Sequence, residues 1–404
     1  MATDKSTTPG LRLPWAGKQV RMEHVEDELM FLWHMAADNM RISQNTNVRT
    51  SVLNFVICAP NVESAYKASM LLRDLASTHI ARVILLIQDR SSDGPGDISI
   101  WTTLRSFSII SDVMRHHFEQ ITVAVSGTAV RSSASIILPL LKPDLPVYLW
   151  WLNDLPDDQM IFHRLLAISS RVIVDSRLFS TPEQRIRGLS ALLQDAPSSA
   201  VSDLNWGRIT PWRELIAQFF DVADYRPYLM NATNITIEHA APSTSGTTNP
   251  LQALLLAAWL KTRLGWQRSE DASHSHQDAP TGTYSWHMTN RTAPRTDRLQ
   301  VQAATSITIA IQPRIQAELP PGALCMVRIT CSANGEHATF TLNRDNGDNH
   351  VSIAVDLPDG HGPQRTVYVT AEHKENDLLH DELEITGRDH LYEETLHEIF
   401  SLLT

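Results

Sequence analysis

Residues 203–221, DLNWGRITPWRELIAQFFD, join a helix start to a concentration of aromatic and basic side chains. Thr210 followed by Pro211 predicts the first turn of a helix, because a hydroxyl can cap backbone donors and the fixed φ of proline suits that turn. The apolar residues that follow share one broad face: Leu215, Ile216, Phe219 and Phe220. We therefore expect a helix that begins at residue 210 and is buried along this face.

Two tryptophans and two arginines lie in the first part of the same stretch: Trp206, Arg208, Trp212 and Arg213. These residue types often dominate the binding energy of protein–protein interfaces, so they are candidates for a partner-binding surface. Trp150 and Trp151, at the end of a predicted strand, form a second candidate cluster. The alternative is that the tryptophans close the core of their own domain, while the arginines pair locally with Asp203.

Upstream of this stretch, apolar β-branched segments alternate with helical patterns. Strands are predicted at 50–59, 81–88, 98–110, 121–125, 145–152 and 171–175, and helices at 62–77, 112–118, 128–141, 158–168 and 182–194. Continuous apolar strands separated by helices favour a mostly parallel sheet with helices on both faces. The fold class predicted for this part is therefore α/β and Rossmann-like.

Several polar residues follow the predicted strands, where ligands gather in such sheets. Those singled out as a possible ligand-binding site are Ser126, Thr128, Asp175 and Ser176. A short polar turn before a helix could hold a phosphate on backbone donors, although neither a Walker loop nor a G-x-G-x-x-G motif occurs in the chain. Turn and helix-cap roles are the alternative interpretation of the same residues.

The pattern changes after residue 228. A helix is predicted over 251–264, ended by Gly265, and short alternating segments joined by turn-rich sequences predict an antiparallel sheet. A final amphipathic helix is predicted over 389–403. We expect three parts: an N-terminal tail and amphipathic helix (1–48), the α/β domain (49–228) and a smaller α+β domain (229–404). The helix over 20–40 is expected to pack on its own domain, with a partner-facing helix as the alternative.

Composition narrows the classes of function. The chain of 404 residues has a net charge of −11 and a pI near 5.8, which disfavours binding to nucleic acid or to an anionic membrane. No signal sequence or stretch of about 18 apolar residues is present, so a cytoplasmic location is expected. The cysteines, Cys58, Cys325 and Cys331, lack metal-ligand spacing. No metal or cofactor is expected.

Four sequence segments together resemble a known family. They are RTSVLN at 49–54, LPVYLWW at 145–151, RVIVDS at 171–176 and the stretch 203–221. In this order they resemble the glucose-6-phosphate dehydrogenase assembly protein family, OpcA, most closely over 49–228. The resemblance implies a non-catalytic protein that binds glucose-6-phosphate dehydrogenase and promotes its assembly or activation in the oxidative pentose phosphate pathway. Such a protein acts by binding one state of its partner more tightly than another.

A second hypothesis belongs to a different class of function. The α/β domain could be an enzyme or a small-ligand binder that holds a phosphorylated sugar or a nucleotide at the strand ends. A deep pocket at those residues would favour this hypothesis, whereas a shallow surface with exposed Trp and Arg would favour the assembly factor.

Overall fold

The structure is a computed structural model, and it divides into two compact units. It describes residues 11–43, 51–75, 81–89, 94, 96–110, 114–155, 160–195, 199–242, 248–269, 276–278, 282–290, 306–333, 336–344, 349–362, 364–369, 374–385 and 387–403. Unit 1 comprises Met1–Val174, Ala196–Val201 and Glu382–Thr386. Unit 2 comprises Asp175–Asp195, Ser202–Asp381 and Gly387–Thr404.

Unit 1 is built on an eight-stranded sheet with the order β1-β4-β5-β3-β2-β6-β7-β8. The strands are β1 (Lys18–Val20), β2 (Leu53–Ala59), β3 (Ala81–Asp89), β4 (Ile98–Ile110), β5 (Met114–Ser126), β6 (Val147–Trp151), β7 (Arg171–Val174) and β8 (Ala200–Asp203). From β5 to β7 the neighbouring strands pair in parallel, whereas β1 and β4 pair antiparallel. Every residue of β2 is buried, as a strand covered on both faces requires. The predicted mostly parallel α/β sheet is confirmed.

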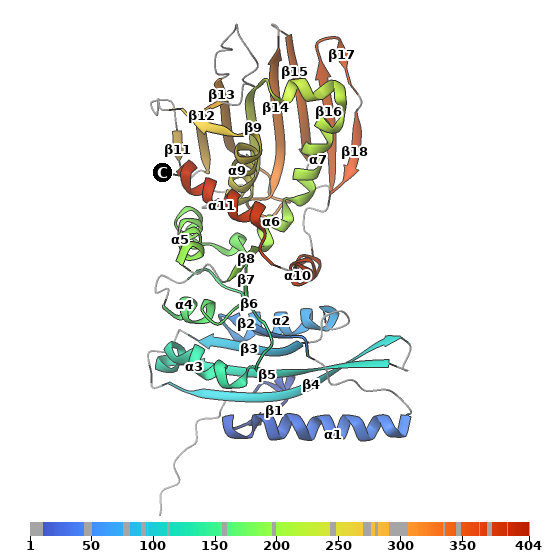
Figure 1. Cartoon of the computed structure of the whole chain (residues 1–404), viewed down its shortest axis with the longest axis vertical. Coiled ribbons are helices and arrows are strands. Elements are labelled where there is room, and N and C mark those ends of the chain that lie inside the picture. Colours follow the sequence, from blue (N-terminus) through green and yellow to red (C-terminus); the bar gives the residue numbers. More distant parts are fainter. Residues whose placement is uncertain are drawn as a thin grey trace, which may run out of the picture. The chain divides into compact units, whose positions relative to one another are not determined.

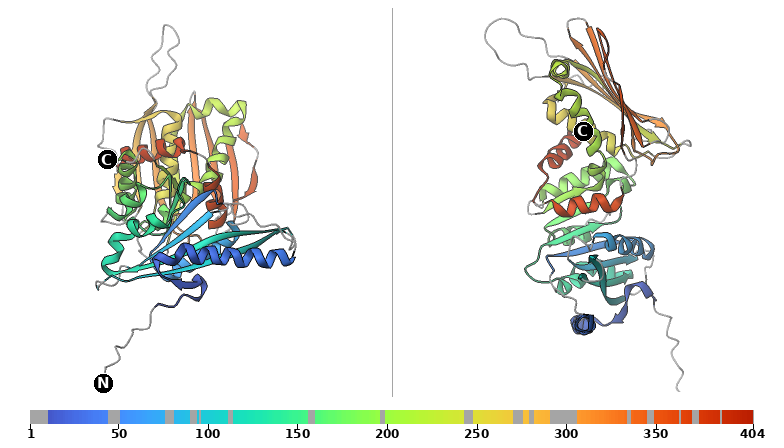
Figure 2. Two further views of the ribbon diagram at one scale, coloured as in Figure 1. Left: turned by 60° about the horizontal axis from the view of Figure 1, so that its bottom comes forward. Right: turned by 90° about the vertical axis from the view of Figure 1, so that its right-hand side faces the viewer.

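Four helices accompany this sheet: α1 (Val25–Ser43), α2 (Val62–Leu75), α3 (Ser133–Ile137) and α4 (Met160–Leu166). Short 3-10 turns are η1 (Pro14–Ala16), η2 (Met22–His24), η3 (Gly127–Ser132) and η4 (Leu138–Leu140). Figures 1 and 2 show α2 on one face of the sheet, with α3 and α4 on the other. The short helix predicted over 112–118 is wrong where the structure describes it, because residues from Met114 onward extend β5 and pair with β4.

Helix α1 is held to the sheet by buried charges as well as by apolar contacts. Arg82 donates to Glu119 at 2.7 Å and to Glu26 of α1, and Trp33 of α1 donates its indole N–H to Glu119 at 2.7 Å. Arg82 and Glu119 are almost completely buried. Burial opposes ionisation of Glu119, yet its pKa is lowered because Arg82 and Lys142 stabilise the carboxylate.

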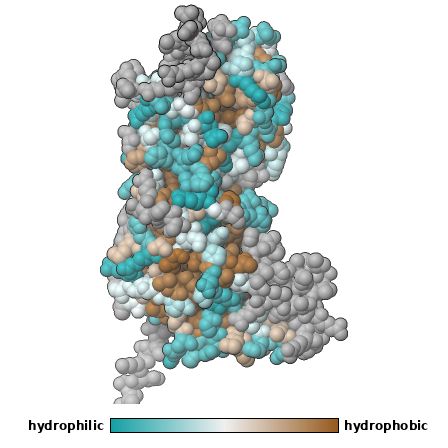
Figure 3. Space-filling view, in the orientation of Figure 1, coloured by the Kyte–Doolittle hydropathy of each residue, from teal (hydrophilic) through white to brown (hydrophobic). Residues whose placement is uncertain are grey.

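The opposite side of α1 carries large apolar residues that solvent reaches. The exposed fractions are 45% for Met30, 54% for Phe31 and 49% for Met35. The helix therefore packs on its own domain, as expected, and also presents an apolar outer surface. Other parts of the chain also have exposed large apolar side chains. The space-filling view shows hydrophobic areas among hydrophilic ones on the face that it draws (Figure 3).

Unit 2 contains a ten-stranded sheet whose main path is β10-β12-β13-β9-β14-β15-β16-β17, with β11 paired to β12 and β18 to β16. The strands are β9 (Ala232–Ala241), β10 (Trp266–Arg268), β11 (His276–Asp278), β12 (Thr283–Asn290), β13 (Ser306–Ile315), β14 (Leu324–Ala333), β15 (Glu336–Arg344), β16 (His350–Leu357), β17 (Gly360–His361) and β18 (Arg365–Tyr368). The pairs are antiparallel except β13 with β9. The predicted antiparallel sheet is confirmed.

The remaining helices are α5 (Pro182–Asp195), α6 (Leu204–Arg208), α7 (Thr210–Asp221), α8 (Arg226–Leu229), α9 (Leu251–Leu264), α10 (Glu375–Glu384) and α11 (His390–Leu403), with the 3-10 turns η5 (Ser176–Leu178) and η6 (Ala223–Tyr225). In unit 2, α7, α9 and α11 lie on one face of the sheet, as Figure 2 shows. Side chains alternate accordingly: Ile235 and Ile237 are fully buried, whereas Thr236 between them is half-buried. Gly265 ends α9 in the left-handed conformation with φ of 65°, as the sequence predicts.

The two units do not follow the boundary predicted at residue 228. Residues 175–195 and 202–228 group with the second sheet, and residues 382–386 return to unit 1. There Arg171 donates to the carbonyl of Ile385 at 3.0 Å and lies 3.8 Å from the carboxylate of Glu382. Sequence patterns show where elements begin and end, but they do not show these long-range contacts.

Candidate functional site

The stretch that opens the sequence analysis forms a buried hydrogen-bonded network within unit 2. It starts at Asp203, whose Oδ1 accepts hydrogen bonds from the backbone N–H groups of Ser176 and Asn205, each at 2.9 Å. Asp203 thus caps α6, a helix that the sequence reasoning missed. The cap predicted at Thr210 is wrong, because Ile209 precedes α7 and the Thr210 hydroxyl instead accepts from Arg213.

The Asp203 carboxylate is fully buried, and this environment changes its acidity. Burial raises its pKa to about 6, and the nearby Asp175 carboxylate adds to the rise, while hydrogen bonds from Ser176 and Asn205 oppose it. The hydroxyl of Tyr392 lies 3.5 Å from the other carboxylate oxygen. The group is therefore an internal structural acid that a substrate does not reach.

A bidentate ion pair completes the inner part of the network. Arg208 donates to both oxygens of Asp175, at 2.7 and 2.8 Å. Asn205 donates to the Ser176 hydroxyl at 3.1 Å and accepts from Gln252 of α9 at 2.9 Å. The carboxylate of Asp175 raises the pKa of Arg208 in spite of burial, which alone would lower it. These contacts fix the start of α6 against α9.

The two tryptophans of the stretch, Trp206 and Trp212, also make their polar and cation–π contacts within unit 2. The Trp206 indole N–H donates to Asp389 at 3.0 Å, and the guanidinium of Arg213 lies 3.6 Å from the centre of its ring. Burial lowers the pKa of Arg213 to about 10. Trp212 lies below the guanidinium of Arg344, 5.3 Å away. The stretch is therefore the packing centre where α6 and α7 meet α11 and the sheet.

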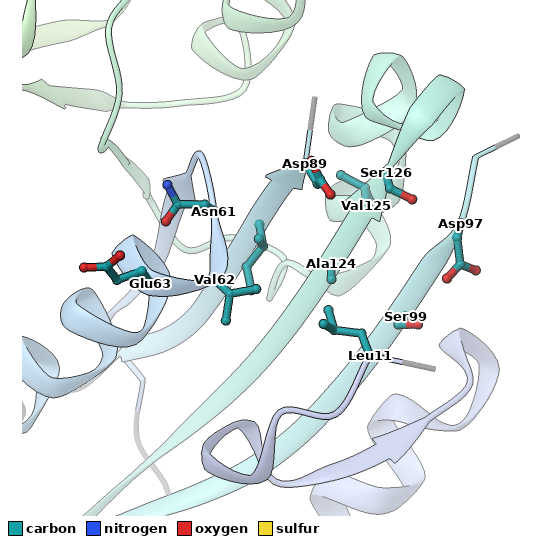
Figure 4. A pocket seen from close by; sticks show the side chains of 11 residues that line it. Leu11, Asn61, Val62, Glu63, Asp89, Asp97, Ser99, Ala124, Val125 and Ser126 are labelled. Atoms are coloured by element: carbon teal, nitrogen blue, oxygen red, sulfur yellow. The ribbon is translucent and has the colours of Figure 1, made fainter. Parts of the chain in front are cut away.

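A separate cavity of about 570 Å³ lies in unit 1, at the carboxyl ends of β3 and β5 and the start of α2. Its walls come from residues of four elements and the preceding N-terminal segment: Leu11, Asn61, Val62, Glu63, Ile87, Asp89, Asp97, Ser99, Ala124, Val125 and Ser126. Figure 4 shows Val62 across the cavity from Leu11 and Ala124, and Asp89 near Ser126, while Glu63 points away. The lining thus combines an apolar floor with a polar rim.

One side of the cavity is held by backbone contacts between the start of β4 and the end of β5. The N–H of Ser126 donates to the carbonyl of Asp97 at 3.1 Å. The N–H of Gly96 donates to the Thr128 hydroxyl, also at 3.1 Å. These bonds fix Asp97 beside Ser126 at the rim.

Two family models match the chain in order and together cover more than half of it. The glucose-6-phosphate dehydrogenase subunit N-terminal domain model matches residues 72–191, and the corresponding C-terminal domain model matches residues 199–396. The chain belongs to the OpcA family. Both features described above lie mainly inside these matches, with Leu11 and the start of α2 outside them.

Curated relatives of this OpcA-family chain come from cyanobacteria. The OxPP cycle protein OpcA of Synechocystis is 28% identical over 287 residues, which are 70% of this chain and 56% of the relative. The OpcA of Nostoc punctiforme is 36% identical over 149 residues, which are 37% of this chain and 30% of the relative. The chain thus matches about half or less of the length of these relatives. An NAD-binding oxidoreductase of Klebsiella pneumoniae aligns with a TM-score of 0.46 and 10% identity, covering 88% of this chain and 96% of the other.

The structure of this OpcA-family chain places the predicted partner-binding residues mostly in the interior. Trp206, Arg208, Trp212, Trp150 and Trp151 are each at most 6% exposed. Trp150 stacks with Phe55, and Trp151 packs edge-on against Phe162 in unit 1. Arg213 is half-buried. The tryptophans match the alternative of a core role, whereas Arg208 pairs with Asp175 instead of the Asp203 of that alternative. A direct contact with a partner stays a prediction that burial disfavours for all but Arg213.

The four predicted strand-end residues fall into different units. Ser126 lines the cavity of unit 1 and Thr128 is bonded beside it. Asp175 and Ser176 belong to unit 2, where both are buried in the network around Asp203. Sequence reasoning missed Asp89 and Asp97, although Asp89 directly follows the predicted strand 81–88 and carried the same strand-end signal.

Two further observations concern the described parts of this OpcA-family chain. None of its helices there is long and apolar enough to cross a membrane. No three His, Cys, Asp or Glu side chains among the described residues are grouped closely enough to hold a metal ion.

Proposed function

We propose that this chain is a non-catalytic assembly factor that binds glucose-6-phosphate dehydrogenase and promotes its active oligomeric state in the cytoplasm. The observation that carries the proposal is the match, in chain order, to both glucose-6-phosphate dehydrogenase subunit domain models. The names of the curated relatives, which refer to the OxPP cycle, agree with a role in oxidative pentose phosphate metabolism.

The physical basis of such an activity is a difference in affinity. A protein that binds one oligomeric state of the dehydrogenase more tightly shifts the equilibrium toward that state by the ratio of the two affinities. This requires a specific surface and no nucleophile.

The test is to measure dehydrogenase activity and oligomer mass with the enzyme of the same organism, with and without this chain. We expect a co-eluting complex of larger mass and a rise in activity that saturates with added chain. An unchanged mass and an unchanged activity at micromolar concentrations would overturn the proposal.

Three variants refine the test of the contact surface. Arg213→Ala removes the predicted contact residue that is half-buried, and Phe31→Ser removes the most exposed apolar side chain among the residues of α1 whose burial the structure describes. Arg328→Ala, an exposed arginine on the sheet of unit 2, is the matched control. If a variant no longer forms the complex with the dehydrogenase while its unfolding midpoint is unchanged, the altered residue belongs to the contact surface. If both Arg213→Ala and Phe31→Ser still form the complex, neither residue is part of that surface.

The competing hypothesis of a phosphorylated sugar or nucleotide at the strand ends meets its criterion only in part, because Ser126 lines the cavity of unit 1 whereas Asp175 and Ser176 are buried in unit 2. Asp89 and Asp97 are among the described residues that line the cavity such a ligand would enter, and Lys and Arg are absent from that described lining. The described lining therefore offers a phosphate group no cationic side chain to bind. We therefore retain the assembly factor as the function.

A further inference from the structure

The sheet of unit 2 has one face that is covered by helices and one that is open. Trp286 donates its indole N–H to the carbonyl of Leu402 in α11 at 2.9 Å, and the ring of Phe340 lies 5.4 and 4.9 Å from those of Phe219 and Phe220 in α7. These side chains of the sheet therefore face the helices. Because successive side chains of a strand point to opposite faces, their neighbours lie on the other face, and no helix of the described chain lies over that face (Figure 2).

This outward face is continuous across six strands, from β12 through β13, β9, β14 and β15 to β16. The pairing of the strands places one outward residue of each strand in a single row: Ser285, Ala310, Thr236, Arg328, Thr341 and Ala354. All of these side chains except Arg328 are small and half-buried. Asn234, Thr330 and Thr339 lie in the row beside it. We call the outward side chains of these six strands the open sheet face, and its central rows are nearly flat.

The open sheet face is electrically balanced, although the chain is acidic. The charged side chains at the described outward positions of the six strands are two arginines and two acids: Arg314, Arg328, Glu238 and Asp356. Glu238 lies 3.6 Å from Arg314. No lysine occurs at these positions, and depletion of lysine and of acids is typical of the centre of a protein interface.

This charge balance favours a second copy of the chain as the occupant of the face. Each chain has a net charge of −11, so two copies repel one another, and their contact is least unfavourable where the local charge cancels. In a two-fold contact both copies present the same surface, so a balanced face meets a balanced face. A strongly charged partner would find no complementary potential on this surface.

The shape and the area of the face also suit a second copy. Sheets twist with a fixed hand, so two copies of one sheet can pack face to face with their strands about 30° apart and about 10 Å between the sheets. The small side chains in the central rows allow this approach. The six strands have eight to ten residues each. Six strands about 4.8 Å apart and eight residues of about 3.4 Å give a face of roughly 800 Å², which is about the area that each partner buries in a stable interface.

We propose that the open sheet face is a self-association surface, on which two copies of this chain pack sheet against sheet about a two-fold axis. The proposal goes beyond the assembly function and does not depend on it, because the contact is between copies of this chain and forms without the dehydrogenase. A dimer of this kind presents every other surface of the chain twice.

The first experiment measures the mass of the full chain alone by sedimentation equilibrium at micromolar concentrations. We expect a mass of twice the 45.3 kDa of one chain. A mass that stays at 45.3 kDa up to high micromolar concentrations would overturn the proposal.

Two variants and a control assign the contact to the open sheet face. Thr341→Arg and Thr330→Arg each place a long cation in the flat centre of the face, and a two-fold contact brings this cation in from both copies. Each variant should weaken dimerisation on the order of 100-fold. Ala217→Arg adds the same side chain to an exposed position of α7 and should leave the doubled mass unchanged. If both face variants dimerise as tightly as the natural chain, with the circular dichroism spectrum of the natural chain, the contact lies elsewhere and the proposal is wrong.

The same variants distinguish a second copy from the dehydrogenase as the occupant. If the natural chain is monomeric, and Thr341→Arg and Thr330→Arg lose the dehydrogenase complex while Ala217→Arg keeps it, the face binds the dehydrogenase and self-association is overturned. A doubled mass of the chain alone, without any effect on the dehydrogenase, would instead support self-association and overturn the assembly function. The two proposals can therefore fail separately.

Discussion

Replacing Asp203 by asparagine should remove a specific dependence of stability on pH. Burial raises the pKa of this carboxyl group to about 6 from its ordinary value of 3.8. In Asp203→Asn the amide oxygen can still accept the two backbone N–H bonds that Oδ1 now accepts. The substitution therefore removes the titration and keeps the cap of α6.

The sign and size follow from linkage. Because the folded pKa lies above the unfolded value, the folded state binds more protons between about pH 4 and pH 6, and stability falls as pH rises through this window. A rise of about two units corresponds to about 3 kcal/mol, at about 1.4 kcal/mol per unit. The full cost of the buried negative charge is present above about pH 6 and absent below about pH 4.

The assay is urea unfolding of both chains from about pH 4 to pH 8, with the difference in unfolding free energy followed against pH. The difference between Asp203→Asn and the natural chain should change by about 3 kcal/mol in favour of the variant, mostly between pH 4 and 6. Asp221→Asn, at an exposed acid of the same unit, should show no such change. A difference that is constant with pH, or one that moves in favour of the natural chain as pH rises, would refute the reasoning.

Three other substitutions or treatments test the fold. Arg82→Met should lower the unfolding free energy by about 3–5 kcal/mol, because it removes the closest cation from the buried carboxylate of Glu119, and adding Glu119→Leu should restore part of this loss in urea unfolding. Gly322→Ala should cost at least about 2 kcal/mol in thermal unfolding, because its φ is +84° and a Cβ would meet the carbonyl oxygen of Asn249; full stability would contradict this geometry. The two cysteines of β14, Cys325 and Cys331, should react with a thiol reagent only after unfolding, because both are buried and burial raises the pKa of each thiol to about 12. Rapid labelling of these cysteines in the native chain would contradict this prediction.

The type of each sheet could be predicted from the sequence because local patterns decide it. Runs such as Leu53–Ala59 are apolar except for Asn54 and are buried throughout, as parallel strands covered on both faces are, whereas β12 alternates between buried and half-buried residues. The start of β5 could not be predicted in this way. Its residues look helical locally, but pairing of Phe118 with Arg105 and of its neighbours with the rest of β4 extends them as a strand.

The candidate sites were harder to predict, because residue type does not distinguish a core from an interface. Trp206 is buried by contacts with Asp389 and Tyr392, which are far away in the sequence. Similarly, Asp89 and Asp97 become the rim of one cavity only because β5 lies between β3 and β4. Neither arrangement leaves a signal in local sequence patterns.

The return of residues 382–386 to unit 1 has a consequence for biosynthesis. A ribosome makes the chain from its first residue, so Glu382 and Leu383 emerge only after most of unit 2 has been made. Until then Arg171 lacks the carbonyl of Ile385, and the apolar hollow lined by Leu53 and Phe55 lacks Leu383. Unit 1 therefore completes its folding at the end of translation, and a nascent chain that stops early exposes this apolar surface to chaperones and proteases.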